Sequence, residues 1–177
     1  MKILFLSHYY PPEGNAPANR VSQHCKRWAA SGHQVRVITC VPNTPNGVPY
    51  KGYRNKWVQC EKIDGVDVIR VWTFLAANKG TFRRSLNYIS FLLAAIWRTA
   101  RISAPDIVVA TSPQFFCGWA GVFAARIKRA PFVLEIRDVW PESISAVFKG
   151  SRGKYIISFV FIKILEILEK IMYKSAT

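Results

Sequence analysis

The 177 residues suffice for one domain with a sizeable core and are too few for two typical domains. Half of them are hydrophobic and only 20% are charged, which excludes disordered, collagen-like and low-complexity proteins. Lys and Arg number 25 against 10 Asp and Glu, a net charge of +15. A surplus this large attracts polyanions, so nucleic acids, phosphorylated substrates and anionic membranes all remain as ligand classes.

The first forty residues predict a strand, a helix and a second strand. Residues Lys2–Ser7 form a short apolar run followed by a segment rich in Pro and Gly, typical of a buried strand that enters a functional loop. Apolar residues follow helical spacing from Asn15 to Ser31, and Gly32 supplies a left-handed cap residue. Residues Gln34–Cys40 are rich in β-branched side chains. This βαβ unit predicts a parallel sheet.

The middle of the chain predicts a loop, a hairpin and a long helix. Residues 42–55 contain too many Pro, Gly and Asn for a regular element. The segments 57–63 and 66–73 flank Asp64-Gly65, a strong hairpin signal, and we expect one arm to join the main sheet. From Phe82 to Ile102, apolar residues recur at 82, 86, 89, 93, 96 and 100, which marks one helix face.

The last third predicts two more strands with their helices. Residues 106–110 and 132–137 are strand segments, and helices are expected over 114–128 and 155–173. Ser112 and Pro113 fit the N-cap and first turn of the former helix. The fold class is therefore α/β, a Rossmann-like, doubly wound and mainly parallel sheet flanked by helices, with strand order 3-2-1-4-5. Gly14, Ser112 and Asp138 should share its carboxyl edge.

The four cysteines predict a reducing environment. None of them has the spacing of a zinc site, and the N-terminal segment lacks a small-residue cleavage site. We therefore expect a cytoplasmic protein whose thiols are reduced and buried as small hydrophobic groups. These thiols belong to Cys25, Cys40, Cys60 and Cys117.

The helix over 82–102 combines basic and aromatic residues. Both long helices are too short or too charged to span a bilayer. From residue 68 to residue 105 there are six basic residues and no acidic one, which suits a helix resting on an anionic membrane surface. The alternative is that both helices simply cover the sheet. The residues predicted to contact the membrane are Phe82, Arg83, Arg84, Phe91 and Trp97.

The first strand-to-helix turn lies where α/β folds bind ligands. It contains one glycine and neither G-x-G-x-x-G nor a P-loop, which argues against a nicotinamide dehydrogenase or a nucleoside triphosphatase. Gly14 is either an ordinary loop glycine or the point where a diphosphate approaches the backbone. His8 either donates to a sugar hydroxyl or phosphate, or is a packed loop histidine.

The segment EIRDVWPES, residues 135–143, follows the last predicted strand. A carboxylate at the carboxyl end of a strand, here Asp138, can accept a hydrogen bond from a substrate hydroxyl or act as a base. Asp138 can equally cap a short helix that starts after Pro141.

Three segments together resemble a known family. They are KILFLSHYYPPEGNAPANR, SGHQVRVITC and the R-D-x-W-P-E-S motif in EIRDVWPES. The chain resembles the N-terminal half of family-4 glycosyltransferases of GT-B fold, particularly bacterial enzymes of colanic acid and O-antigen synthesis. The resemblance implies a retaining transfer from a nucleotide-sugar to a glycan acceptor, expected to be lipid-linked, without a cofactor or an essential metal. Residues 1–177 would be the acceptor-side domain, and the nucleotide-sugar-binding C-terminal domain would be absent from this chain.

The resemblance also implies roles for individual residues. Gly14 and Asn15 would face the donor diphosphate through backbone N–H groups, and Asp138 would be the catalytic residue beside the reacting sugar. Many relatives have His where this chain has Arg137, which leaves Arg137 as a phosphate contact or an ion-pair partner. The acceptor side would comprise His8, Arg20, Arg137, Trp140 and Glu142.

Three functions therefore compete. The first is the acceptor-binding half of a glycosyltransferase, peripheral on the inner face of the cell membrane. The second is a non-catalytic, membrane-recruiting subunit of a split enzyme. The third is a basic nucleic-acid-binding module, which explains the charge but neither the R-D-x-W-P-E-S motif nor the apolar helices, so we expect no nucleic-acid partner.

Overall fold

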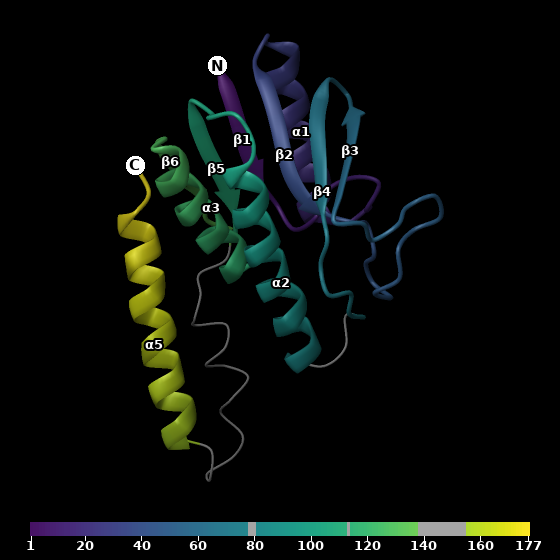
Figure 1. The fold of residues 1–177 in the computed structure, drawn as a ribbon. Coiled ribbons are helices and arrows are strands. Elements are labelled where there is room, and N and C mark those ends of the chain that lie inside the picture. Colours follow the sequence, from purple (N-terminus) through teal and green to yellow (C-terminus); the bar gives the residue numbers. More distant parts are fainter. Residues whose placement is uncertain (78–80, 113, 138–154) are drawn as a thin grey trace.

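A computed structural model describes residues 1–77, 81–112, 114–137 and 155–177, with a six-stranded sheet between helices (Figure 1). The strands are β1 (Lys2–Leu6), β2 (Gln34–Cys40), β3 (Val58–Ile63), β4 (Val66–Val71), β5 (Ile107–Thr111) and β6 (Phe132–Glu135). The helices are α1 (Ala16–Ala30), α2 (Thr81–Ala100), α3 (Phe115–Lys128) and α5 (Tyr155–Lys174).

The sheet has the order β3-β4-β2-β1-β5-β6. The five strands other than β3 run parallel, and along the chain they follow the predicted 3-2-1-4-5 order. We expected one arm of the hairpin to join the main sheet, and both arms belong to it. β4 pairs with β2 in parallel, and β3 pairs with β4 as an antiparallel edge strand. The turn between them has positive φ at Asp64 (49°) and Gly65 (82°), as a two-residue type I′ hairpin requires.

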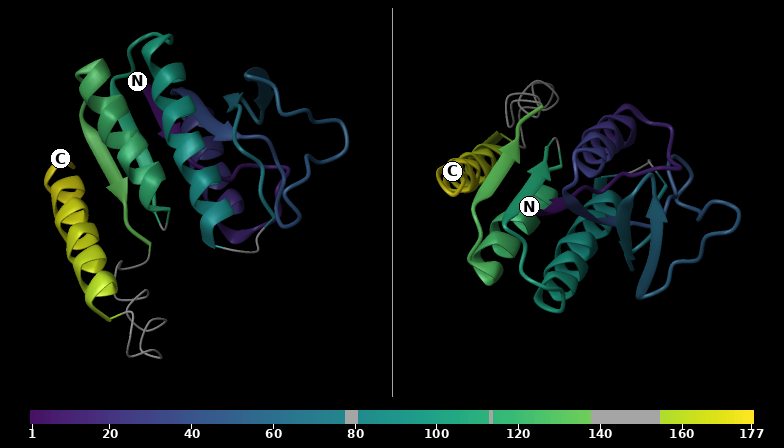
Figure 2. Two further views of the ribbon diagram at one scale, coloured as in Figure 1. Left: turned by 60° about the horizontal axis from the view of Figure 1, so that its bottom comes forward. Right: turned by 90° about the horizontal axis from the view of Figure 1, so that it is seen from above.

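The two faces of the sheet have separate cores because side chains alternate along each strand. On β1, Ile3 and Phe5 pack with Val21 and Cys25 of α1. Leu4 and Leu6 point to the other face, into the core that α2 and α3 cover. Figure 2 shows α1 on one face of the sheet and α2 and α3 on the other, with α5 beside α3. This is the doubly wound arrangement that the sequence predicts.

Two glycines let helix α3 make close contacts, Gly121 with the sheet and Gly118 with α5. A Cβ atom on Gly121 would come within 2.6 Å of the Ala110 Cβ atom and 2.5 Å of the Phe132 ring. A Cβ atom on Gly118 would meet the side chain of Met172 on α5. The absence of side chains at these positions lets α3 fill the space between the sheet and α5.

The cysteines differ from the prediction at one position. All four are free thiols, and Cys25, Cys40 and Cys117 are buried as expected. Cys60 is exposed, because it lies on the edge strand β3, where no helix covers its side chain.

Candidate functional site

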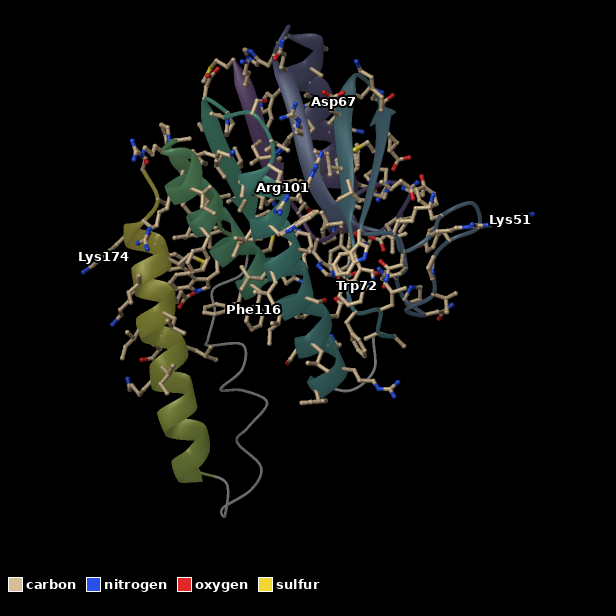
Figure 3. All side chains as sticks on the ribbon, in the orientation of Figure 1. Lys51, Asp67, Trp72, Arg101, Phe116 and Lys174 are labelled. Atoms are coloured by element: carbon tan, nitrogen blue, oxygen red, sulfur yellow. The ribbon has the colours of Figure 1, made fainter. Side chains whose placement is uncertain are left out.

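The carboxyl ends of the five parallel strands meet at one edge of the sheet. Trp72, just after β4, and Phe116, at the start of α3, lie toward this edge in Figure 3, whereas Asp67 lies toward the opposite one. Two surface hollows lie at the opposite, amino edge, one of them lined by Asp67 and Arg101. We place the candidate site at the carboxyl edge, since open parallel sheets bind ligands beyond the carboxyl ends of their strands.

Arg70 on β4 organises the loops at this edge. Its side chain is 2% exposed, and its Nε donates to the Glu61 carboxylate. The same guanidinium donates to the carbonyl oxygen of Cys40 at 3.0 Å and to that of Pro11. Its carbon also lies 4.9 Å from the centre of the Tyr53 ring. One buried cation thus joins the loop after β1, the end of β2, the edge strand β3 and the long loop after β2.

Glu13 holds the same long loop from the other side. It is 2% exposed, and its Oε1 accepts hydrogen bonds from the backbone N–H groups of Asn43 (2.9 Å) and Thr44 (3.0 Å). Sequence reasoning missed both Glu13 and Arg70. The signal for Glu13 was an acid in an otherwise uncharged Pro- and Gly-rich turn, and the signal for Arg70 was a lone cation in an apolar strand.

His8 is buried directly after β1. Its ring packs edge-on against Tyr9, Tyr88 and Phe91, with centroid distances of 4.9, 5.3 and 5.0 Å. Burial lowers the pKa of His8 from its ordinary value to about 3, with a smaller opposing effect from Asn87. The imidazole is therefore neutral at physiological pH. Its Nδ1 atom is buried without a partner among the described residues.

The N-terminus of α1 contains the predicted diphosphate site. The Asn15 side chain accepts a hydrogen bond from the Ala18 N–H at 2.9 Å, so Asn15 is the N-cap. Pro17 has no N–H to offer, which leaves the N–H groups of Gly14, Asn15 and Ala16 as the donors for an anion. A Cβ atom on Gly14 would meet no atom within 4 Å, so the backbone there is open to approach. Diphosphate binding stays a prediction.

Arg20 lies on α1 and forms an ion pair with Glu135 at the end of β6. The Arg20 side chain is 45% exposed, and Nδ1 of His24 lies 4.0 Å from the same carboxylate oxygen. The other oxygen of Glu135, Oε2, is buried without a partner in the described part of the chain. This ion pair holds Arg20 at the carboxyl edge. Glu135 was not predicted from the sequence as a site residue.

Ser112 is not the N-cap of α3, contrary to the prediction. The pairing of β5 with β6 continues past Thr111, and the Ser112 N–H donates to the Glu135 carbonyl oxygen at 2.9 Å. The Ser112 Oγ then accepts a hydrogen bond from the Arg137 N–H at 2.8 Å, and the N-cap position falls to Gln114. The Arg137 side chain has buried Nε and Nη1 atoms without partners among the described residues.

Unpaired polar atoms concentrate at this edge. Within the described ranges, ten buried side-chain N or O atoms have no hydrogen-bond partner, and seven of them belong to five residues at or just beyond the carboxyl ends of β1, β4, β5 and β6. These residues are His8, Thr73, Gln114, Glu135 and Arg137. Buried polar groups are nearly always paired, so these atoms, unpaired among the described residues, have hydrogen-bonding capacity left for water or a ligand.

Three predicted site residues, Asp138, Trp140 and Glu142, lie outside the described residues, so their roles stay predictions. In the part of the chain that the structure describes, no three His, Cys, Asp or Glu side chains gather as a metal site requires. The expectation that no metal is essential is not tested by this.

An open polar edge on a doubly wound sheet fits many enzymes, so comparison with known proteins decides the family. The family model of the glycosyl transferase 4-like domain matches residues 15–157. The chain belongs to this family. It is also 26% identical over 156 residues to WcaI of Escherichia coli K12, a protein named as a colanic acid biosynthesis glycosyl transferase. The match covers 87% of this chain and 38% of WcaI, so the chain spans about two-fifths of that relative's length.

The Arg70 network predicts a large effect of one substitution. Arg70→Met should lower the free energy of unfolding by about 3 kcal/mol or more, because it removes the cation that pairs with Glu61 and the donor to two carbonyl oxygens. Urea titration followed by circular dichroism measures this. The matched control is Lys26→Met, which breaks the exposed ion pair with Asp64 and should cost less than about 1 kcal/mol. Equal losses in the two variants would contradict the proposed network.

The burial of His8 predicts a pH dependence of stability. The unfolded state binds a proton at His8 below its ordinary pKa, and the folded state does so only below a pKa of about 3. Stability should therefore fall as the pH drops from 6.5 towards 3, by up to about 1.4 kcal/mol per unit from this group, and be insensitive to His8 above pH 7. His8→Phe keeps an aromatic ring but removes the titrating nitrogen atoms. Urea titrations of this variant across the same range should give a shallower slope of stability against pH. A slope equal to that of the native chain would place the pKa of His8 near its ordinary value.

Proposed function

We propose that the chain is the acceptor-binding half of a retaining glycosyltransferase that builds a bacterial surface polysaccharide, such as lipopolysaccharide. The observation that carries the proposal is the cluster of unpaired, buried polar atoms at the carboxyl edge of a glycosyl transferase 4-like domain. Sugars bind through many neutral hydroxyl groups, each of which both donates and accepts, and such an edge offers both kinds of partner.

A second domain completes the enzyme in this proposal. It belongs to a GT-B architecture, binds the nucleotide-sugar and closes over the carboxyl edge, so that the donor diphosphate reaches the α1 N-terminus. The relative WcaI is named as a glycosyl transferase, and 62% of its length lies outside the match. The N–H groups at Gly14 and Asn15 then stabilise the leaving diphosphate, and Asp138 lies beside the acceptor hydroxyl.

Helix α2 supports a further part of the proposal, contact with a membrane. The predicted apolar face does not cover the sheet, because Asn87, Phe91, Ala95 and Thr99 are the residues that α2 buries. The apolar residues exposed on α2 are Phe82, Leu86, Ile89, Leu93 and Trp97. The prediction that Phe91 contacts a membrane is therefore wrong, since its ring is fully buried against His8.

The charges around this α2 face favour an anionic bilayer surface as its partner. Arg83 and Arg84 are exposed beside Phe82, and at the other end the Arg101 guanidinium lies 4.1 Å from the centre of the Trp97 ring. No described helix is both long and apolar enough to cross a membrane. We propose that α2 lies along the inner face of the cell membrane and that the acceptor is linked to a lipid in the same bilayer.

Sugar transfer tests the first part of the proposal. The 177-residue chain alone should show no transfer, and the chain joined to its nucleotide-sugar-binding domain should be active. In that complete enzyme, Asp138→Asn should lower turnover about 10²- to 10⁴-fold, because it removes the carboxylate and preserves size. Radiolabelled transfer to a lipid-linked acceptor measures this.

The stability of Asp138→Asn, measured by thermal unfolding, serves as the control and should be close to that of the native enzyme. Near-normal turnover of Asp138→Asn would reduce Asp138 to a helix cap. Transfer by the 177-residue chain alone would overturn its role as half an enzyme.

Vesicle binding tests the membrane part. Replacing Arg83 and Arg84 with Glu should weaken binding to anionic vesicles by an order of magnitude or more, since each basic residue near such a surface contributes about 1 kcal/mol. The matched control replaces Arg27 and Arg126, which are exposed on α1 and α3, with Glu and changes the net charge equally. Co-sedimentation at two salt concentrations measures both. If the control weakens binding equally, the net charge of the chain and not α2 governs attachment.

A further inference from the structure

Gln114 is a buried residue at the carboxyl edge whose side-chain amide has no hydrogen-bond partner in the part of the chain that the structure describes. It occupies the N-cap position of α3, a helix of 14 residues, and is 9% exposed. Neither its Oε1 nor its Nε2 atom has a hydrogen-bond partner among the described residues. A carboxamide carries two donor hydrogens and one acceptor oxygen, and all of this capacity is removed from bulk water here.

Helix capping does not explain this side chain. The N-cap side chain makes no hydrogen bond to the first turn of α3. The backbone carbonyl oxygen of Gln114 instead accepts from the N–H groups of Cys117 at 2.9 Å and Gly118 at 3.2 Å, which any residue would do. Ser, Thr, Asp and Asn are the residues that cap through their side chains. Among the described residues, no contact of the Gln114 amide offsets the cost of removing it from water.

The surroundings of Gln114 connect it with the rest of the candidate site. Two residues earlier, Ser112 bonds to the backbone of both Glu135 and Arg137. Three residues later, the Cys117 thiol donates to the Leu6 carbonyl oxygen at 3.3 Å, which fixes the start of α3 against the end of β1. Gln114 thus lies between the ends of β1 and β6, which supply the other unpaired atoms of this edge.

We propose that Gln114 is a specificity-determining residue that reads the hydroxyl groups of a bound sugar. A carboxamide can donate to one ring hydroxyl and accept from its neighbour, a pairing that neither a charged nor an apolar side chain offers. Arg137, whose Nε and Nη1 atoms are also buried without described partners, suits an anionic oxygen beside that sugar. The inference rests on the proposed sugar transfer and adds to it the residue that selects the sugar.

The test uses Gln114→Met, which keeps the size of the side chain and removes both polar atoms. The midpoint of thermal unfolding of the chain should rise by about 2 to 6 °C, because the unpaired amide no longer opposes folding. Binding of the sugar should weaken about tenfold or more. The probes are octyl glucoside and octyl galactoside for an acceptor sugar, and UDP-glucose and UDP-galactose for a donor sugar, each followed by calorimetry.

The matched control is Thr99→Val on α2, away from the carboxyl edge. It removes a hydroxyl that, like the Gln114 amide, is buried without a partner among the described residues. It should raise the unfolding midpoint and leave binding of every probe unchanged. The class of probe that Gln114→Met loses identifies the sugar as acceptor or donor.

Two results would overturn the inference. A lower unfolding midpoint in Gln114→Met would show that the amide has a structural partner, and unchanged binding of the probes that the native chain binds would show that it reads no sugar. If the native chain binds neither class of probe, the result contradicts the proposed sugar site itself. If the native chain binds a probe and Gln114→Met binds it equally well, the result contradicts only the role of Gln114.

Discussion

The buried guanidinium of Arg70 is the constraint on which the site depends. A fully desolvated cation is tolerated only when its hydrogen bonds are satisfied, and here a carboxylate and two backbone carbonyl groups from three separate segments satisfy them. These carbonyl groups have no freedom to move without leaving a charge unpaired. The loops after β1 and β2 are thereby fixed at the carboxyl edge of the sheet, although they contain no regular structure of their own.

The fold could be predicted from the sequence because its signals are local. Apolar runs and helical spacing give the elements, and the Asp64-Gly65 turn gives the hairpin. The sequence does not say which hairpin arm pairs with the parallel strands, because that pairing depends on contacts with the distant strand β2. The face that α2 buries also differs from the sequence prediction. The most regular apolar stripe of the helix is partly exposed, and the buried face instead contains Asn87 and Thr99 along with Phe91.

The candidate site was predicted less completely. His8, two residues after β1, and Arg20, near the N-terminus of α1, could be placed at the carboxyl edge because the loop after β1 leads to both positions. Glu13 and Arg70 act through contacts with segments 30 and 59 residues away, which no local pattern encodes. Gln114 could not be predicted as a site residue, because what marks it is a side-chain amide without a hydrogen-bond partner among the described residues. Only a three-dimensional structure shows that a polar atom is both buried and unpaired.

The exposed thiol of Cys60 has a practical consequence. Burial raises the pKa of Cys25 and of Cys117 to about 12 and also raises that of Cys40, so these thiols hold almost no reactive thiolate. A maleimide dye should therefore attach to Cys60 alone, without any engineering of the other cysteines. Its position on β3 is next to Glu61, the anionic partner of Arg70, so the fluorescence would report on the surroundings of the edge strand that Arg70 holds.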